Sequence, residues 1–374
     1  MTLLDELYSN EGQSPWLDNL RRDWIHNGHL QKLLGDGVRG ITSNPTIFAK
    51  AISGEDDYDE QFKSLLLDHT VEEAYWELVT TDINDALAML NPIYLKSKGT
   101  DGFVSLEVSP ELAHDTASTL EAARKLNAEI NKPNLLVKIP ATLEGIPAIK
   151  AMISEGRNVN VTLIFGIDRY DMVVEAYISG LEAFAKAHPD SDLSHISSVA
   201  SFFVSRVDTE IDRRIDLLSA QVDSARSSEL LELRGKAATT QAKLAYQHFK
   251  DAFSGPRWDA LAQRGGQVQR PLWASTSTKN PNYPDLLYVD SLIGPDTVNT
   301  MPEDTLLAFN DHGTLMRTID SDIDLAKSHL EVLDSIGIDR EDVESTLEKE
   351  GVASFSKSFS DLLDSLNEKA KTFH

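Results

Sequence analysis

Residues 135–140 read LLVKIP and residues 159–164 read VNVTLI, two short apolar runs rich in β-branched residues. Similar runs recur along the chain and alternate with longer helical patterns, which is typical of a barrel or sheet of parallel strands. We predict strands at Ser14–Asp18, Gly40–Asn44, Gly102–Val108, Leu135–Pro140, Val159–Ile164, Ile196–Phe203, Pro271–Thr276 and Leu286–Ser291. Eight strands interleaved with helices favour a closed α/β barrel, (β/α)8, over an open sheet.

The helical stretches fall into two groups. Those between strands are predicted at Asp59–Asp68, Val71–Leu90, Glu111–Asn131, Arg169–His188 and Val207–Ala220, with a long one at Ser228–Asp251 inserted before the seventh strand. From about Asp320 the chain becomes acidic and helical, and Gly337 and Gly351 look like helix stops. We therefore predict a barrel domain at residues 1–319 and a helical extension at residues 320–374 that packs on the outside of the barrel.

Composition narrows the classes of partner and chemistry. The chain has 374 residues, with 35 Lys and Arg against 60 Asp and Glu, and a net charge of −25. Such a surface repels nucleic acids and anionic membranes. Cysteine is absent, which excludes disulfides and thiolate chemistry. The polar, acidic start MTLLDELYSNEGQ does not resemble a signal peptide. We expect a cytoplasmic protein without nucleic-acid or membrane partners.

Several predicted strands contain polar residues. Side chains alternate faces along a strand, and helices cover the outer face of a closed barrel. The polar residues are therefore expected to point inward, near the carboxyl ends of the strands, where barrel enzymes place their chemistry. They are Thr42, Asn44, Ser105, Glu107, Lys138, Asn160, Thr162 and Ser201.

Lys138 is the most informative of these residues. A lysine is costly to bury in its charged form, and a neutral amine can attack a carbonyl carbon. A structural ion pair with Glu107 would explain the same pattern, and Glu107 would then be a counter-ion and not a proton shuttle. Asp18 could be a second acid or base, or the N-cap of the next helix. Asn44, held extended by Pro45, could bind a substrate hydroxyl or cap a helix.

An anion site is predicted at neighbouring strand ends. Arg206 follows the sixth strand, and Ser275, Ser277 and Lys279 follow the seventh. Cationic and hydroxyl groups that converge in this way suit a phosphate. Taken singly, Arg206 could be an ordinary helix-start charge paired with Asp208 or Glu210, and Lys279 could be a solvated loop charge.

Cofactor signatures are weak or missing. His26 and His29 are spaced three residues apart but flank Gly28, which is a poor metal pattern. Neither a dinucleotide-binding nor a P-loop glycine motif occurs. We expect no metal and no organic cofactor.

Five motifs together resemble one family, the transaldolases: GITSNPTIF, LLVKIPAT, NVNVTLIF, ASFFVSRVD and ASTSTKNP, in this order. The resemblance runs from about Trp16 to Ser291, and the longer form with YVDSLIGPDTVNTMP is similar to the branch found in actinobacteria. It implies a TIM barrel of the circularly permuted class I aldolase type, with its reactive lysine on the fourth strand. It also implies transfer of dihydroxyacetone from sedoheptulose 7-phosphate to glyceraldehyde 3-phosphate, without a cofactor.

The resemblance also implies residue roles. Lys138 would form the Schiff base, Glu107 would act as general acid and base through a water, and Asp18 would take the proton that allows C–C cleavage. The remaining residues would orient the substrate or line its pocket: Thr42, Asn44, Asn160, Thr162, Ser201 and Phe203. The phosphate would be held by Arg206, Ser275, Lys279 and, in a shared or substitute role, Ser277.

The chain departs from the family pattern at two points. Relatives usually carry arginine where this chain has Lys279. The first strand matches poorly, so the assignment of Asp18 rests mainly on its Trp-Leu-Asp context.

Three competing functions fit parts of the sequence. A fructose 6-phosphate aldolase would release the intermediate, but that branch carries glutamine in place of Glu107. The second competing function is a non-catalytic sugar-phosphate-binding barrel, and the third is a metal-dependent aldolase. The chain could be a monomer or a homodimer.

Overall fold

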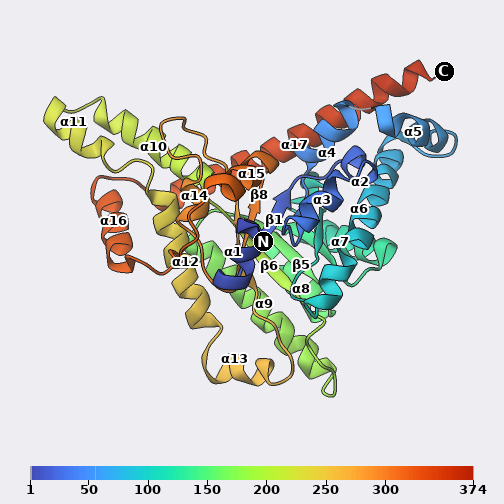
Figure 1. Ribbon diagram of the computed structural model, residues 1–374, viewed down its shortest axis with the longest axis horizontal. Coiled ribbons are helices and arrows are strands. Elements are labelled where there is room, and N and C mark those ends of the chain that lie inside the picture. The colour runs from blue at the N-terminus through green and yellow to red at the C-terminus, as the bar shows by residue number, and fades with distance from the viewer. Residues whose placement is uncertain (1, 55, 374) are drawn as a thin grey trace.

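The computed structural model describes residues 2–54 and 56–373 and consists of one closed barrel surrounded by helices (Figure 1). All eight strands are parallel, and they follow one another around the barrel in sequence order. Their bounds are β1 Gln13–Asp18, β2 Ile41–Thr42, β3 Val104–Glu107, β4 Leu135–Pro140, β5 Val159–Ile164, β6 Ser198–Phe203, β7 Arg270–Ala274 and β8 Thr297–Met301. The prediction of a (β/α)8 barrel is confirmed.

The helices fill the connections and extend beyond them. The first half of the chain forms α1 Leu3–Glu11, α2 Arg22–His26, α3 His29–Gly35, α4 Pro45–Gly54, η1 Asp56–Tyr58, α5 Asp59–Leu65, α6 Val71–Lys96, η2 Pro110–Leu112, α7 Thr116–Ile130 and α8 Gly145–Ser154. The second half forms α9 Ile167–Ala187, α10 Ser205–Ser219, α11 Ser224–Leu231, α12 Ala237–Ala252, α13 Gly255–Ala262, α14 Leu287–Asp290, α15 Glu303–His312, α16 Ile323–Ser335 and α17 Arg340–Thr372.

The predicted eighth strand at Leu286–Ser291 is wrong. This segment forms the single turn α14, which buries Tyr288 and Val289, and the strand lies later, at Thr297–Met301. The reason is that β8 reads TVNTM. Thr297 and Asn299 share one face of the strand, and Thr300 lies on the other face, which lines the pocket, so neither face carries the apolar signal by which a buried strand is found.

Two predictions of helix limits are also wrong. The stretch Ser228–Asp251 is divided into α11 and α12, with Gly235 between them at a φ of 68°. Gly337 does follow α16, with a φ of 89°, but Gly351 lies inside the continuous helix α17. A Cβ at Gly351 would lie 3.0 Å from Leu163 Cδ2, so the glycine permits close packing of α17 on β5 and does not end a helix.

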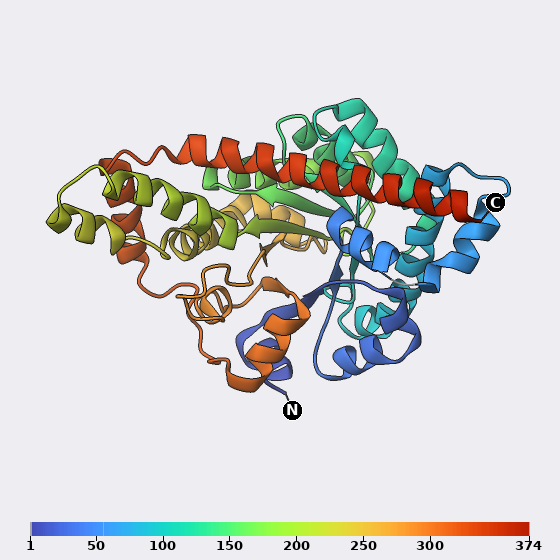
Figure 2. The same cartoon turned by 90° about the horizontal axis from the view of Figure 1, so that it is seen from above.

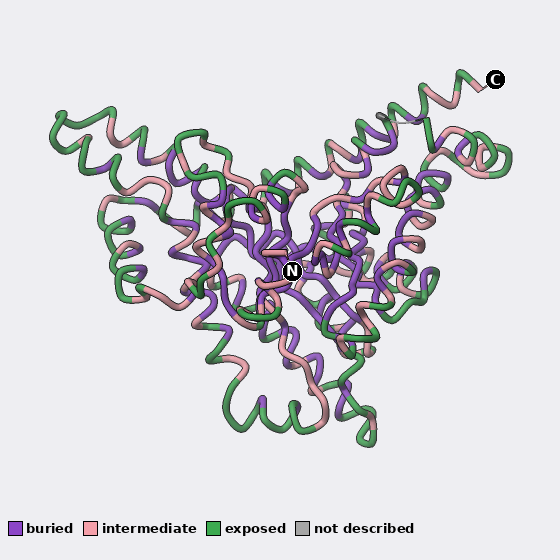
Figure 3. The backbone as a smooth tube through the Cα atoms, in the orientation of Figure 1, coloured by how far each residue is buried: buried purple, intermediate pink, exposed green. Residues whose placement is uncertain are grey.

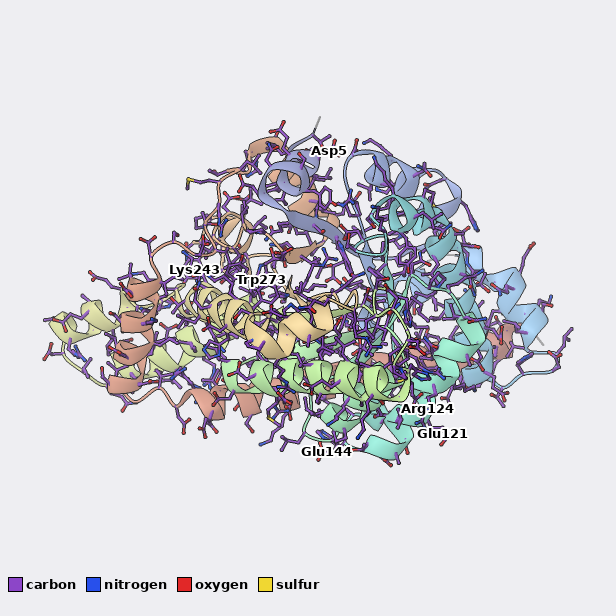
Figure 4. All side chains as sticks on the ribbon, turned by 90° about the horizontal axis from the view of Figure 1, so that it is seen from below. Asp5, Glu121, Arg124, Glu144, Lys243 and Trp273 are labelled. Atoms are coloured by element: carbon purple, nitrogen blue, oxygen red, sulfur yellow. The ribbon has the colours of Figure 1, made fainter. Side chains whose placement is uncertain are left out.

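Burial follows the barrel. The strands are almost wholly buried, whereas the outer faces of the surrounding helices are exposed (Figure 3). Trp273 of β7 is fully buried and lies inside the molecule, whereas Arg124 of α7 lies at its periphery, where it pairs with Glu155 (Figure 4). No helix in residues 2–54 and 56–373 is long and apolar enough to cross a membrane.

The amino end of the barrel is held by one buried carboxylate. Asp101 precedes β3 and is 0 % exposed. It accepts hydrogen bonds from Ser14 Oγ at 2.7 Å, Trp16 Nε1 at 3.1 Å and Arg39 Nε at 2.9 Å. It also forms an ion pair with Arg270, at the start of β7, at 3.2 Å. Asp101 therefore links β1, the segment before β2 and the start of β7, which are far apart in the sequence.

The last helix crosses the molecule. α17 packs against α10 on one side of the barrel and against α4 and α6 on the other, and it passes over β5 between them (Figure 2). Near its start, Glu344 lies against Gly166, the residue before α9, in a hollow that Asp168 and Arg340 also line. The division into residues 1–319 and 320–374 stays a prediction.

We expect Asp101→Ala to lower the free energy of unfolding by about 3–5 kcal/mol, because it leaves two partly buried arginines without their anion. The residual folded protein should keep its activity, since Asp101 lies at the end of the barrel opposite the carboxyl ends of the strands. Denaturant unfolding measures the first effect, with exposed Asp190→Ala as control. A loss as small as that of the control would contradict this role for Asp101.

A second prediction concerns Glu344 and pH. Burial, with Asp168 and Glu341 nearby, raises the pKa of this carboxyl from 4.5 to about 7. The folded state therefore keeps the proton over a range where the unfolded chain loses it, and stability falls as pH rises from about 4.5 through 7. Glu344→Gln should remove that loss. The gain in melting temperature over the wild type should be larger at pH 8 than at pH 5, and equal gains would contradict the prediction.

Candidate active site

A pocket of about 170 Å³ opens at the carboxyl ends of the strands. It is lined by Asp18, Thr42, Asn44, Lys138, Thr162, Ser201, Phe203, Arg206, Ala274, Ser275, Ser277, Lys279, Thr300, Pro302 and Phe355. The structure thus brings together all the predicted site residues except Glu107 and Asn160, which lie behind this lining. The parallel register explains the convergence, because every strand of a barrel delivers its last residues to the same end.

Glu107, Lys138 and Asn160 form one row across three neighbouring strands. Lys138 of β4 is in register with Glu107 of β3 on one side and with Asn160 of β5 on the other. Lys138 Nζ lies 3.3 Å from Glu107 Oε2 and donates a hydrogen bond to the carbonyl oxygen of Ser43 at 3.1 Å. The amine and the carboxyl are both buried. Burial raises the pKa of Glu107, and the nearby Lys138 opposes the rise.

Asn160 is held from two sides. Its side-chain nitrogen donates to Ser105 Oγ at 2.9 Å, and its oxygen accepts from Ser201 Oγ at 2.7 Å. Asn160 therefore fixes Ser201, which does line the pocket.

Two buried oxygens beside this row lack hydrogen bonds. Within the described chain, Thr162 Oγ1 has no hydrogen-bond partner, and the contact of Glu107 Oε2 with Lys138 is not aligned as a hydrogen bond. Buried polar atoms are normally paired, so both oxygens are available to a bound water or a substrate hydroxyl.

Asp18 stands at the end of β1, where its carboxylate is fixed by threonines. Asp18 Oδ1 accepts a hydrogen bond from Thr42 Oγ1 at 2.7 Å, and Thr42 Oγ1 lies 2.6 Å from Thr300 Oγ1. Burial raises the pKa of Asp18, and the charge of Lys138 opposes this rise. The sequence did not indicate Thr300, because it belongs to the strand that was predicted in the wrong place.

The predicted phosphate residues lie together at one side of the pocket. Lys279 Nζ donates to Ser277 Oγ at 2.6 Å, and Ser275 Oγ lies 2.9 Å from Ser205 Oγ. Ser275 has a φ of 57°, a left-handed conformation that is strained for a residue with a side chain and that is frequent at functional sites. Burial lowers the pKa of Lys279, and the neighbouring charge of Arg206 lowers it further.

An outer hollow of about 440 Å³ adjoins the pocket. The two share Asp18, Asn44, Arg206, Pro302 and Phe355, and Lys50 of α4 lines the outer part. Lys50 is also close enough to Lys279 to contribute to the lowering of its pKa. Lys50, Pro302 and Phe355 were not predicted from the sequence. Lys50 and Phe355 lie on helices and Pro302 directly follows β8, and at such positions no periodic signal distinguishes a pocket residue from a packing residue.

The histidines singled out in the sequence have separate partners. His29 Nε2 pairs with Glu303, and His26 Nε2 lies 3.9 Å from Asp85. Across residues 2–54 and 56–373, no group of three or more His, Asp or Glu side chains is arranged to hold a metal ion.

Comparison with known proteins identifies the family. The sequence profile described as Transaldolase/Fructose-6-phosphate aldolase matches residues 15–366. The chain belongs to this family. The resemblance seen in the motifs is thereby confirmed, and the match extends beyond Ser291 into α17.

Similar transaldolases occur in actinobacteria. The chain is 48 % identical over 359 residues to the transaldolase of Thermobifida fusca, and the alignment covers 95 % of each chain. It is 49 % identical over 370 residues to that of Saccharopolyspora erythraea, with 97 % of each chain covered. It is 48 % identical over 360 residues to transaldolase 2 of Streptomyces avermitilis, with 96 % of this chain and 94 % of the relative covered.

Proposed function

We propose that this chain is a transaldolase that moves a dihydroxyacetone unit from sedoheptulose 7-phosphate to glyceraldehyde 3-phosphate through a Schiff base on Lys138. The products are erythrose 4-phosphate and fructose 6-phosphate, and the reaction belongs to the non-oxidative pentose phosphate pathway. The observation that carries the proposal is the buried amine of Lys138, 3.3 Å from the carboxyl of Glu107, in a pocket with two cations, Arg206 and Lys279.

Imine formation needs one amine and one proton donor. The neutral amine of Lys138 attacks the ketone carbon of the donor, and the resulting carbinolamine loses its hydroxyl as water. Glu107 supplies the proton for that loss, either directly or through a water bound with Thr162, and takes a proton back when the imine is hydrolysed. Burial raises the pKa of Glu107, which is the direction that suits a carboxyl acting as a proton donor.

The C–C bond breaks when the hydroxyl next to it loses its proton. Asp18 accepts this proton, and the bonding electrons move into the protonated imine, which becomes an enamine. The aldose product then leaves. In the second half-reaction the enamine carbon adds to the aldehyde of the acceptor, and Asp18 returns the proton to the new hydroxyl. The imine serves as the electron sink, so these steps need no metal or organic cofactor.

The other pocket residues position the sugar phosphate. Asn44, Thr42, Ser201 and Asn160 orient the dihydroxyacetone unit, and Phe203 lines its pocket. Arg206, Ser275, Ser277 and Lys279 hold the distal phosphate by charge and by hydrogen bonds. The cation of Arg206 is fixed over the ring of Phe203, with its Cζ 5.2 Å from the ring centroid.

The transferase is favoured over a lyase of the same family. The similar proteins from Thermobifida, Saccharopolyspora and Streptomyces carry the name transaldolase. Glu107 also stands where the motif resemblance places glutamine in the fructose 6-phosphate aldolases. A purely binding barrel is not favoured, because recognition of a sugar does not require a buried amine. The cytoplasmic location, the lack of nucleic-acid and membrane partners, and the choice between monomer and homodimer stay predictions.

We expect borohydride, added together with fructose 6-phosphate, to trap a covalent adduct on Lys138. Lys138→Arg should abolish the adduct, because a guanidinium stays protonated and forms no imine. The adduct is located by mass spectrometry of peptides, in excess chelator, and exposed Lys132→Arg serves as the matched control. Labelling at any other lysine, or none at all in the wild type, would overturn the proposal.

Glu107→Gln should keep the fold but slow turnover by about 10²–10⁴-fold, the usual loss when a general acid or base is removed. Steady-state kinetics and the melting temperature are measured together, with exposed Glu111→Gln as the control. Unchanged turnover would show that Glu107 is only a counter-ion for Lys138.

A further inference from the structure

The middle of α17 lies over the mouth of the active site. The helix runs for 33 residues and carries one buried stripe, formed by Val343, Leu347, Gly351, Phe355, Phe359, Leu362 and Leu366. Phe355 stands near the midpoint of the helix, and it is the member of this stripe that lines the pocket. The next member of the stripe packs elsewhere: Phe359 lies against Tyr75 and Trp76 of α6.

Contacts on both sides of the mouth hold α17 in place. Glu348 pairs with Arg169 of α9 at 2.7 Å, and Asp342 pairs with Arg214 of α10 at 2.8 Å. On the opposite side, Ser358 Oγ lies 2.8 Å from Thr46 Oγ1 of α4. The helix therefore bridges the barrel end and is not attached at one edge only.

A local distortion of β5 accompanies the approach of the helix. The register between β5 and β6 shifts between Val161 and Ile164, and Leu163 has a φ of 59°. Leu163 is also the side chain that approaches Gly351. Thr162 lines the pocket, whereas the next residue, Leu163, packs against Gly351 of α17. The strand and the helix therefore meet one helical turn before Phe355.

Phe355 lies where the inner pocket meets the outer hollow, since it is among the residues that line both. Its centroid lies 5.9 Å from Lys138 Nζ and 5.8 Å from Arg206 Cζ, and the residue is 4 % exposed. An aromatic face within about 6 Å of a cation is attractive to it. Phe355 thus stands beside both the reacting nitrogen and the guanidinium assigned to the phosphate.

We propose that Phe355 is a specificity-determining residue that favours transfer of the dihydroxyacetone unit to an acceptor aldehyde over its release as free dihydroxyacetone. This inference rests on the proposed function. Phe355 acts by covering the Schiff base on the side of the outer hollow and by keeping a positive charge on the imine nitrogen next to an aromatic face.

The competing reactions differ in their need for water. In transfer, the enamine carbon forms a C–C bond with the aldehyde, and the new alkoxide receives a proton. In release, the enamine carbon takes a proton instead, and one water molecule adds to the C=N bond to give dihydroxyacetone and the free amine of Lys138. An apolar ring over the nitrogen restricts the supply of water and protons to the second route while the first product leaves.

A purely structural role for Phe355 makes a different prediction. If the ring only anchored α17, its loss would lower stability and would slow transfer and release in parallel. The stripe offers a matched control, since Phe359 is also buried on the same helix but does not line the pocket. Comparing equal truncations at the two positions separates the two roles.

The experiment uses the full chain with Phe355→Leu, Phe355→Ala and Phe359→Leu. Free dihydroxyacetone formed from fructose 6-phosphate is measured without an acceptor, and transfer is measured with erythrose 4-phosphate as the acceptor. We expect the release-to-transfer ratio to rise about tenfold in Phe355→Ala as water gains access, with a smaller rise in Phe355→Leu. In Phe359→Leu the melting temperature should fall while the ratio stays at the wild-type value.

Borohydride trapping on Lys138 distinguishes failure of this inference from failure of the proposed function. If the adduct forms in Phe355→Leu but the release-to-transfer ratio equals that of the wild type and of Phe359→Leu, the inference is wrong and the proposed function stands. If the wild type gives no adduct, the proposed function itself fails. Should Phe355→Ala not fold, Phe355→Leu, which conserves more of the apolar volume, decides the matter.

Discussion

The structure depends on keeping the amine of Lys138 and the carboxyl of Glu107 side by side and away from bulk water. Burying either group alone in charged form is costly, and even a paired arrangement is seldom a net gain in stability. The barrel makes it possible by register, because neighbouring parallel strands place Glu107, Lys138 and Asn160 in one row. The Ser43 carbonyl accepts one of the lysine's hydrogens. Around this row, Asn160 has hydrogen-bond partners on both sides, whereas Thr162 Oγ1 and Glu107 Oε2 have none among the described residues and are available to a water or substrate.

The net negative charge of the molecule repels a phosphate-bearing substrate, and cations gathered at the pocket reverse this repulsion locally. A chain with a net charge of −25 repels phosphates at long range. At the pocket, however, Arg206 and Lys279 converge from the ends of β6 and β7, and Lys50 adds a third cation on the outer side. Burial lowers the pKa of Lys279, because its charged form loses solvation there. A bound phosphate would offset that loss. Recognition of the anion is thus confined to one end of the barrel.

The closure of this end comes from the far end of the sequence. α17 reaches across the barrel because Gly351 allows it to approach Leu163, and ion pairs with α9 and α10 hold it there. A strand residue in a left-handed conformation costs about 1–3 kcal/mol, so such strain persists only where surrounding packing imposes it. Here the strained residue is Leu163, which lies between Thr162 in the pocket and the helix α17. The helix that was expected to be an outer addition thereby becomes part of the wall around Lys138.

The sequence by itself determined the barrel, the family and most of the pocket. Alternation of side chains along strands is a local property, so Lys138, Thr162 and Ser201 could be assigned to the inner face from spacing alone. It failed for β8, whose polar residues lie on both faces and hide the strand, and for Gly351, where a glycine that permits close packing reads like a helix stop. Phe355, Lys50 and Thr300 were decided only by the tertiary structure. Their role depends on which segments meet across the barrel, and contact between residues distant in sequence leaves no periodic trace in the chain.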